Sequence, residues 1–401
     1  MKGKEFADLL EQHRYDFFAG VPCSLLEGVL SALAARPRPP YLPATREDAA
    51  VGCAAGAWLA GGRPAVLMQN SGLGTSLNAL ASLSLLYGLP CLLVVTWRGF
   101  QGKDAPEHLL MGDISPRLLD LVSIPYRALT VPSVEADLAW ATRETLTREQ
   151  PVALLLPPGV LETEHERGND RDWDRAKTRS DATIPAGHGR GDRVPSEAGC
   201  GARAQIDDVT SLKARMSRYD ALSAVINCLA DEPVIHANGY ICRESYAVAD
   251  RPQNFYMIGS MGLASSMGLG IALTRPERKT VIFDGDGNLL MNLGSLSMVG
   301  GLGPRNFVHF VFDNEVYGST GDQPSLSREV RLDRLAAASG YRSVRAVSDA
   351  SALETTTREA LSADGPAFIL VKVTPESRAV PRIPYAPPVI RDRFRAALGA
   401  R

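Results

Sequence analysis

The sequence of 401 residues has few cysteines, no long apolar run and no excess of either charge. Its six cysteines include no Cys-x-x-Cys pair, which argues against a zinc site or a disulfide framework and favours reduced thiols in the cytoplasm. No segment has the ~18 uncharged apolar residues that a membrane span needs, and the N-terminus lacks the apolar stretch of a signal peptide. A net charge of −2 gives no electrostatic reason to expect nucleic acid as a partner.

Short apolar runs bounded by glycine and proline alternate with helical patterns in both halves of the chain. Runs of this kind are typical of parallel strands that helices cover on both faces, so the sequence predicts an α/β fold with two doubly wound sheets. Residues 162–218 have mixed charge and many glycines, and we expect a flexible polar linker between domains at 1–161 and 219–401. The expected strands are Phe17–Gly20, Ala65–Met68, Cys91–Thr96, Val152–Leu156, Val234–Ala237, Phe255–Ile258, Thr280–Phe283, Phe307–Phe312 and Ala367–Val373.

The segment Thr280–Asn288 joins a predicted buried strand to a carboxylate, Asp286, that has glycines on both sides. Asn314 ends the next apolar run 28 positions later (314 − 286), which is about the length of one strand, helix, strand crossover. Parallel topology would bring both side chains to one sheet edge. Their oxygen atoms are suitable ligands for Mg²⁺. The neighbouring glycines would let backbone N–H groups approach phosphates. An EF-hand loop begins similarly, but Leu289 and Ser295 stand where it needs Gly and Glu, so an ordinary glycine-rich turn is the remaining alternative.

The pairing of Asp286 with Asn314, and Asn288 directly after Gly-Asp-Gly, resembles the diphosphate-binding signature of thiamine diphosphate-dependent enzymes. The resemblance implies thiamine diphosphate and Mg²⁺ as cofactors. It also implies that Asp286, Asn314 and Val316 hold the metal ion. The cofactor-binding residues that it implies are Gly259, Ser260, Met261, Gly285, Asp286, Gly287, Asn288 and Asn314.

Two more segments can be interpreted either as purely structural or as contacts to the cofactor. Glu47 begins a segment of small and apolar residues, where an acid can simply stabilise a helix N-terminus, as its neighbour Asp48 can. The segment also resembles the one from which the family's glutamate activates the cofactor, through a hydrogen bond to pyrimidine N1′ in an apolar site. Met261 fits a core methionine beside a tightly packed helix. By the resemblance, it instead separates the two rings of the cofactor.

Further segments narrow the resemblance to the branch of phosphonopyruvate and sulfopyruvate decarboxylases, over nearly the whole chain outside the linker. They are Gly20–Leu26, Met68–Leu80, Thr96–Gly99, Lys103–His108 and Asn238–Arg243. A small anionic 2-oxo acid substrate calls for fixed cations and donors in loops after strands. His108 is a catalytic candidate, and the substrate-binding candidates are Ser24, Asn70, Arg98, Lys103 and Arg243.

The resemblance implies non-oxidative decarboxylation of phosphonopyruvate to phosphonoacetaldehyde, with sulfopyruvate as the alternative substrate and a carboligase as the third option. The final proton donor stays open, because Thr320 or Asp322 stand where several decarboxylases have a glutamate. His108 can serve instead, whereas His309, inside an apolar strand, fits a structural role.

The resemblance also implies a homodimer or larger homo-oligomer, because the cofactor would lie between a first-half domain of one subunit and a second-half domain of another. A cofactor-binding scaffold that has lost its chemistry is the alternative from a different class. The presence of Glu47, Asp286 and Asn314 argues against that alternative.

Overall fold

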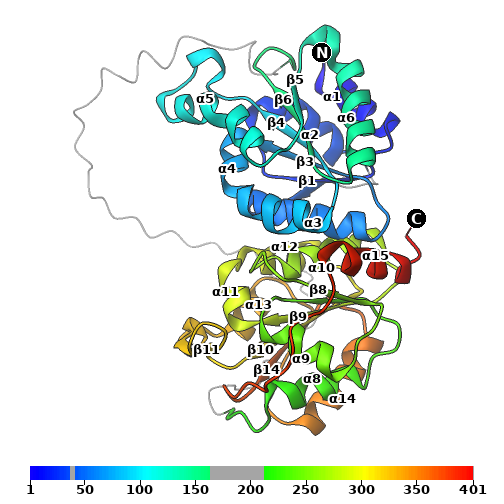
Figure 1. The fold of residues 1–401 in the computed structure, drawn as a ribbon, viewed down its shortest axis with the longest axis vertical. Coiled ribbons are helices and arrows are strands. Elements are labelled where there is room, and N and C mark those ends of the chain that lie inside the picture. Colours follow the sequence, from blue (N-terminus) through cyan, green and yellow to red (C-terminus); the bar gives the residue numbers. More distant parts are fainter. Residues whose placement is uncertain (37–40, 163–211, 401) are drawn as a thin grey trace, which may run out of the picture.

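The computed structural model describes residues 1–36, 41–162 and 212–400. They form two halves, each built on a six-stranded sheet in which every neighbouring pair of strands is parallel (Figure 1). Helices lie on both faces of the sheets, so the predicted doubly wound α/β fold is confirmed. Of the predicted linker, residues 163–211 lie outside the described part of the chain.

The first half has the strand order β2-β1-β3-β4-β6-β5. Its strands are β1 (Phe17–Gly20), β2 (Tyr41–Pro43), β3 (Pro64–Gln69), β4 (Leu92–Thr96), β5 (Tyr126–Ala128) and β6 (Val152–Leu156). Its α-helices are α1 (Gly3–Gln12), α2 (Glu27–Ala34), α3 (Glu47–Leu59), α4 (Asn70–Ala79), α5 (Pro106–Leu121) and α6 (Val134–Arg148). Single turns or short helices are η1 (Ser24–Leu26), η2 (Leu80–Leu85), η3 (Phe100–Gly102) and η4 (Val131–Ser133).

The second half has the strand order β13-β14-β10-β9-β7-β8 and a separate hairpin of β11 and β12. Its strands are β7 (Val234–His236), β8 (Asn254–Tyr256), β9 (Thr280–Gly285), β10 (Phe307–Asp313), β11 (Val316–Tyr317), β12 (Gln323–Pro324), β13 (Ser343–Val347) and β14 (Ala367–Lys372). Its helices are α8 (Arg218–Ile226), α9 (Tyr240–Val248), α10 (Ala264–Thr274), α11 (Asp286–Met291), α12 (Gly294–Leu302), η7 (Leu326–Arg328), α13 (Leu332–Ala338), α14 (Ala350–Ser362) and α15 (Pro387–Ala397).

The two halves meet where α3 packs along α10 (Figure 1). Both helices are rich in small residues, which lets their backbones approach closely. A Cβ added at Gly56 would lie 2.8 Å from the carbonyl carbon of Met267, and one at Gly270 would lie 2.8 Å from the backbone nitrogen of Ala57. The C-terminal helix α15 also returns to the first half, where Arg395 donates a hydrogen bond to the carbonyl oxygen of Trp58.

We therefore expect Gly56→Ala to lower the free energy of unfolding by about 1–3 kcal/mol, because the new methyl group forces α3 and α10 apart. Gly301→Ala is the matched control, since its Cβ would meet nothing within 4 Å in an exposed part of α12. That change should not destabilise the protein, because alanine favours helical backbone more than glycine does and the new methyl group meets nothing. Urea unfolding followed by circular dichroism measures both, and equal shifts in the two variants would contradict the close packing of α3 on α10.

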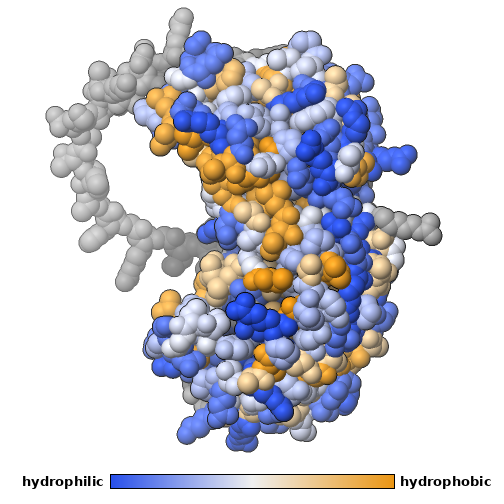
Figure 2. Space-filling model, viewed as in Figure 1, coloured by the Kyte–Doolittle hydropathy of each residue, from blue (hydrophilic) through white to orange (hydrophobic). Residues whose placement is uncertain are grey.

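None of the described helices is long and apolar enough to cross a membrane. The five cysteines in the described residues are free, and the sixth, Cys200, lies outside them. Apolar side chains are exposed at Leu109 and Leu110 of α5, at Met291 of α11 and at Leu293 just after it. Figure 2 shows apolar surface that extends from the α5 side of the first half toward the contact between the halves. Contiguous apolar surface of this kind is typical of a contact with another protein chain.

Candidate active site

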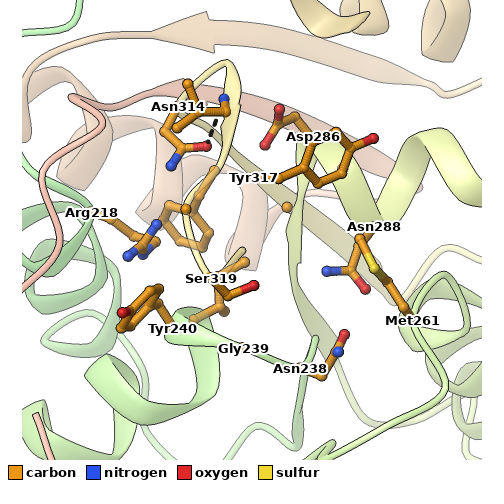
Figure 3. Close-up of a pocket in the computed structure, with 16 residues that line it drawn as sticks. Arg218, Asn238, Gly239, Tyr240, Met261, Asp286, Asn288, Asn314, Tyr317 and Ser319 are labelled. Atoms are coloured by element: carbon orange, nitrogen blue, oxygen red, sulfur yellow. Dashed lines mark hydrogen bonds between the residues drawn. The ribbon is translucent and has the colours of Figure 1, made fainter. Parts of the chain in front are cut away.

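A pocket opens at the carboxyl ends of β7, β9 and β10 in the second half. It is the edge at which ligands bind in open parallel sheets. Its lining comes from the loops and helix starts that follow these strands and β8, together with α8 and the β11 hairpin (Figure 3). The residues that line it are Arg218, Asn238, Gly239, Tyr240, Ile241, Met261, Gly285, Asp286, Gly287, Asn288, Phe312, Asn314, Val316, Tyr317, Gly318 and Ser319.

The register of β9 and β10 explains why Asp286 and Asn314 share this pocket. Gly285 pairs with Phe312, so the residues that follow each strand emerge side by side. Asp286 is the first residue of α11, and Asn314 directly follows β10. Figure 3 shows both side chains at the same end of the pocket.

The Asp286 side chain is buried, with 3% of its surface exposed, and its neighbours are polar groups. Burial raises the pKa of Asp286 to about 6, and the negative charge of nearby Asp313 adds to this shift. The Ser327 hydroxyl lies 3.1 Å from Oδ2 of Asp286 and 2.8 Å from Oδ1 of Asp313. Lys372 donates a hydrogen bond of 2.8 Å to the other oxygen of Asp313. A cation in the pocket would offset the two buried negative charges.

The oxygen donors of the pocket fit a hard divalent cation bound together with a phosphate. The described residues contain no cluster of three or more His, Cys, Asp or Glu side chains suited to a metal ion. Mg²⁺ needs only one or two carboxylates when phosphates supply further oxygens, and Asp286 with the Asn314 amide oxygen meets that need. The Asn314 Oδ1 atom accepts a hydrogen bond of 3.4 Å from the backbone nitrogen of Val316 (Figure 3). This bond keeps Val316, the third residue predicted to bind the metal ion, beside Asn314.

Glycines keep the floor of the pocket open. A Cβ at Gly287 would lie 2.9 Å from Cδ1 of Tyr317, so a larger residue there would have to displace the Tyr317 ring. The Asn288 Oδ1 atom accepts a hydrogen bond of 3.1 Å from the backbone nitrogen of Gly262, which ties the start of α11 to the loop before α10.

Of the loop after β8, Met261 lines the pocket, whereas Gly259 and Ser260 do not. The Ser260 hydroxyl lies 2.6 Å from the hydroxyl of Ser82 in the first half. A Cβ added at Gly259 would lie 3.3 Å from the Cβ of the same Ser82. In one chain, these two residues therefore contact the first half and do not face the pocket.

The first-half candidates lie at the carboxyl edge of the other sheet. Ser24, Glu47, Asn70 and Arg98 follow β1, β2, β3 and β4 in turn. Glu47, at the start of α3, packs directly on Gly72 at the start of α4. A Cβ at position 72 would come within 2.7 Å of Oε1 of Glu47. The absence of a side chain at Gly72 is therefore what leaves room for the Glu47 carboxyl.

Asn70 and Arg98 belong to one hydrogen-bonded group. The Asn70 amide, fully buried, donates to the carbonyl oxygen of Arg98 (2.9 Å) and to the hydroxyl of Ser115 (3.1 Å). Its Oδ1 atom has no hydrogen-bond partner among the described residues. Both amide protons are thus used, and the group that Asn70 can offer a ligand is an acceptor.

The Arg98 guanidinium forms a bidentate pair with Asp104 in which both distances are 2.6 Å. This pair holds the pKa of the Asp104 carboxyl well below its usual range. The Nη1 donor of Arg98 takes no part in the pair and is the group left to meet an anion.

The remaining candidates are more open. Lys103 is exposed in the loop that begins at Arg98. His108, in α5, is partly buried, and its nearest charged partner is Glu107 at 4.0 Å. Arg243, in α9, lies over the ring of the pocket residue Tyr240 at 5.5 Å. Ser24 lines a separate surface groove in the first half.

Two family models match the chain. The model of the thiamine pyrophosphate enzyme N-terminal binding domain matches residues 2–116, and that of the C-terminal binding domain matches residues 240–371. The phosphonopyruvate decarboxylase of Streptomyces viridochromogenes is 38% identical over 94% of this chain and 90% of its own length. The chain belongs to the thiamine diphosphate-dependent decarboxylase family. The predicted family and the predicted enzyme class, a carboxy-lyase, are confirmed.

Other relatives of this decarboxylase carry related names. The sulfopyruvate decarboxylase of Methanosarcina acetivorans is 31% identical over 98% of the chain and 97% of its own length. In Methanococcus maripaludis, sulfopyruvate decarboxylase has two subunits. Its subunit beta is 38% identical over 46% of this chain and 98% of the subunit, and its subunit alpha is 37% identical over 38% of this chain and 90% of the subunit.

Solved structures share the fold of this decarboxylase at much lower identity. Benzoylformate decarboxylase of Polynucleobacter necessarius aligns with a TM-score of 0.67 at 16% identity, over 95% of this chain and 100% of that one. The 4-hydroxybenzoylformate decarboxylase of Rhodococcus jostii aligns with a TM-score of 0.69 at 14% identity, over 93% of this chain and 99% of that one.

Several pocket residues of this decarboxylase were not predicted from the sequence, among them Arg218, Asn238, Tyr317 and Ser319. Asn238 stands in a segment that carries the resemblance, and its position after β7 could have indicated it. Arg218 lies in the last position of the predicted linker, where nothing in the composition separates it from a solvated charge.

Two histidines in the described part of this decarboxylase are fully buried. His309, in β10, lies 3.3 Å from Oδ2 of Asp284 and 3.0 Å from the hydroxyl of Tyr341, which agrees with a structural role. His236 ends β7 and is held by the hydroxyl of Ser245 (2.7 Å) and the carbonyl oxygen of Phe255 (3.2 Å). Burial lowers the pKa of His236 to about 3.

Because the pKa of His236 is depressed in the folded protein, the unfolded chain binds its proton first as the pH falls below 6.5. We expect this residue to reduce the free energy of unfolding by up to about 2 kcal/mol between pH 6.5 and about pH 5. His236→Gln should flatten that part of the profile. Urea unfolding at several pH values measures the difference, and parallel profiles for both proteins would contradict it.

Proposed function

We propose that this protein decarboxylates 3-phosphonopyruvate to phosphonoacetaldehyde and CO₂, without oxidation, in a phosphonate pathway that leads to an antibiotic. The observation that carries the proposal is the 38% identity over 94% of the chain to the phosphonopyruvate decarboxylase of Streptomyces viridochromogenes. The identity to the sulfopyruvate decarboxylase of Methanosarcina acetivorans is 31%. The chain also has an acid, Glu47, in the first half and the pair Asp286 and Asn314 in the second.

In this proposal the pocket of the second half, within the diphosphate-binding domain 219–401, holds the diphosphate of the cofactor with Mg²⁺. Asp286, the Asn314 amide and Val316 would hold the ion. The support is the buried carboxyl, the adjacent amide oxygen and the glycine-floored pocket beside them. Thiamine diphosphate supplies an electron sink for the bond to CO₂. Met261 lines the side of the pocket that leads away from Asp286 and Asn314, where it would support the two rings (Figure 3).

Glu47, in the pyrimidine-binding domain 1–161, would hold a proton against N1′ of the cofactor's pyrimidine. Its support is the position at the start of α3, where it contacts Gly72 and lies on an apolar helix.

The phosphonate head of the substrate would meet the cationic groups of Arg98, Lys103 and Arg243. Arginine suits a phosphonate because its forked donors can bind two oxygens. Asp104 already holds two donors of Arg98, so that residue would offer Nη1. The hydroxyl of Ser24 would add a donor.

His108 would return a proton to the carbon from which CO₂ has left. It is partly buried at the start of α5, near the loop that holds Arg98. Thr320 and Asp322 are the other candidates, and both are exposed in the hairpin loop between β11 and β12. An exposed group is less suited to a step from which water must be excluded.

A homodimer or larger homo-oligomer with shared active sites would complete the machinery. The pocket is lined by second-half residues alone among the described residues, so Glu47 does not reach it within one chain. The exposed apolar side chains beside α5 and α11 offer a surface for a second copy. We place the assembly in the cytoplasm, without nucleic acid or membrane as a partner, in keeping with the net charge of −2.

The second candidate function is sulfopyruvate decarboxylation to sulfoacetaldehyde. It is favoured by the match of each half to a separate subunit of sulfopyruvate decarboxylase at 37–38% identity. Steady-state assays with phosphonopyruvate, sulfopyruvate and pyruvate, in the presence of Mg²⁺ and thiamine diphosphate, separate the two. We expect the highest kcat/KM for phosphonopyruvate, whereas a higher value for sulfopyruvate would replace the first proposal by the second.

A further inference from the structure

Arg218 is the only basic residue among the sixteen described residues that line the second-half pocket. It is the first residue of α8 and is 5% exposed. Figure 3 shows its guanidinium group directed toward the pocket, between Asn314 and Tyr240. A buried cation that faces a cavity needs a structural partner, a ligand or both.

Glu244 holds this guanidinium in place. Its oxygens accept hydrogen bonds of 2.9 Å from both Nε and Nη2 of Arg218. Glu244 is fully buried and also accepts a hydrogen bond of 3.2 Å from the backbone nitrogen of Arg378. The guanidinium further lies 5.4 Å from the ring centre of Tyr240. Helix α9, which carries both Glu244 and Tyr240, thus fixes the orientation of Arg218 before any ligand binds, and the backbone of Arg378 supports Glu244.

The pair leaves one donor group of Arg218 without a partner. An arginine has five N–H donors, and the pair with Glu244 uses those of Nε and Nη2. The Nη1 atom makes no hydrogen bond to any residue that the structure describes. The Nη1 group therefore lies at a pocket wall with charge-assisted donors that only a ligand or water can use. Such donors favour phosphate oxygens, which accept the forked geometry of arginine.

The negative charge of a bound diphosphate favours a cationic donor such as Arg218. A terminal phosphate ester carries about −1.5 to −2 charges near pH 7, and the inner phosphate of a diphosphate adds another. With the carboxylate of Asp286, this exceeds what one divalent ion compensates. In Figure 3, Arg218 and Met261 lie on opposite sides of the pocket. If Met261 marks the ring end of the cofactor, Arg218 marks the end that holds the terminal phosphate.

Resting on the function proposed above, we propose that Arg218 donates hydrogen bonds from Nη1 to the terminal phosphate of the cofactor, with Glu244 as the residue that positions it. The assignment adds a direct cationic contact to the metal-mediated one through Asp286 and Asn314. It also gives the first residue of α8 a role in cofactor retention.

Isothermal titration of the full-length protein with thiamine diphosphate and with thiamine monophosphate, at one fixed Mg²⁺ concentration, tests the assignment. Arg218→Gln should weaken the binding of thiamine diphosphate about 10- to 100-fold, the range expected for a lost hydrogen bond to a charged group. Binding of thiamine monophosphate should change less than about threefold, since it lacks the terminal phosphate. Arg218→Lys, which keeps the charge, should lie between wild type and Arg218→Gln.

The double variant Arg218→Gln/Glu244→Gln separates ligand binding from a purely structural ion pair, because it leaves no buried charge unpaired. Continued weak binding of thiamine diphosphate, at an apo Tm close to wild type, supports the assignment. Recovery of wild-type affinity in the double variant, or equal losses for both ligands, would overturn it. If wild-type protein binds no thiamine diphosphate, the proposed function and this assignment are both wrong, whereas wild-type binding that Arg218→Gln leaves unchanged removes only the assignment.

Discussion

Replacement of Glu47 by glutamine should lower kcat for decarboxylation by about 10²- to 10⁴-fold, the range typical of a lost proton-transfer group. The amide fills the same space against Gly72 but cannot share a proton with pyrimidine N1′. Cofactor affinity should change little, because in our proposal the other half of the molecule holds the diphosphate. Turnover and thiamine diphosphate affinity, measured on the same preparation, separate these two effects.

Asp48→Asn is the matched control for Glu47→Gln. Asp48 is the next residue of α3, and its carboxylate is paired with Arg46 at 3.0 and 2.8 Å. A surface pair of this kind contributes little, so turnover should stay within about twofold of wild type. If Glu47→Gln kept full turnover, or if Asp48→Asn lost as much activity, the catalytic assignment of Glu47 would be wrong.

Replacement of Asp286 by asparagine should weaken Mg²⁺-dependent binding of thiamine diphosphate at least about 100-fold, because even outer partners of metal ligands cost 10- to 100-fold. The replacement keeps the size of the side chain and its contact with Ser327 but removes the charge that attracts the ion. Turnover at a fixed cofactor concentration should fall with it. Titration calorimetry with and without Mg²⁺ measures the loss.

The control for Asp286→Asn is Asp364→Asn, an exposed carboxylate of the same half. It should leave both cofactor affinity and turnover unchanged. The apo Tm of Asp286→Asn should not fall, since the variant buries one charge less. Unchanged Mg²⁺-dependent affinity in Asp286→Asn would mean that the ion is held elsewhere.

The central strands of both sheets could be predicted because each is built around a short apolar run. β4, β6 and β9 are buried throughout, and their sequence runs are uninterrupted. The strands that the sequence did not indicate are β2, β5 and β13, which lie at the edges of the sheets, and the two-residue strands of the β11 hairpin. An edge strand is covered less completely, so it can be short and polar, as Tyr126–Ala128 is.

The proximity of Asp286 and Asn314 follows from the sequence because one crossover separates them and parallel strands end at one edge. Contacts between distant segments have no such signal. Ser327, which reaches Asp286 and Asp313, lies in a short turn after the β11 hairpin, and Arg218 depends on Glu244, 26 positions away. Only the folded chain brings these residues to the pocket.

The substrate-binding candidates show the same limit. Arg98 was predicted from its place after a strand, but no sequence pattern indicates that Asp104 takes two of its donors. Asn70 was predicted as a donor, and the structure shows both of its amide protons in use. Position along a strand therefore indicates which residues reach the sheet edge, whereas their free hydrogen-bonding groups depend on tertiary partners.

The most direct test of the account is a crystal structure of the full-length protein with Mg²⁺ and thiamine diphosphate. We predict that the ion binds Asp286 and Asn314 together with the diphosphate, and that the Glu47 carboxyl of a neighbouring subunit contacts pyrimidine N1′. An ion bound away from Asp286 and Asn314, or a pyrimidine with no contact to any Glu47, would contradict the account.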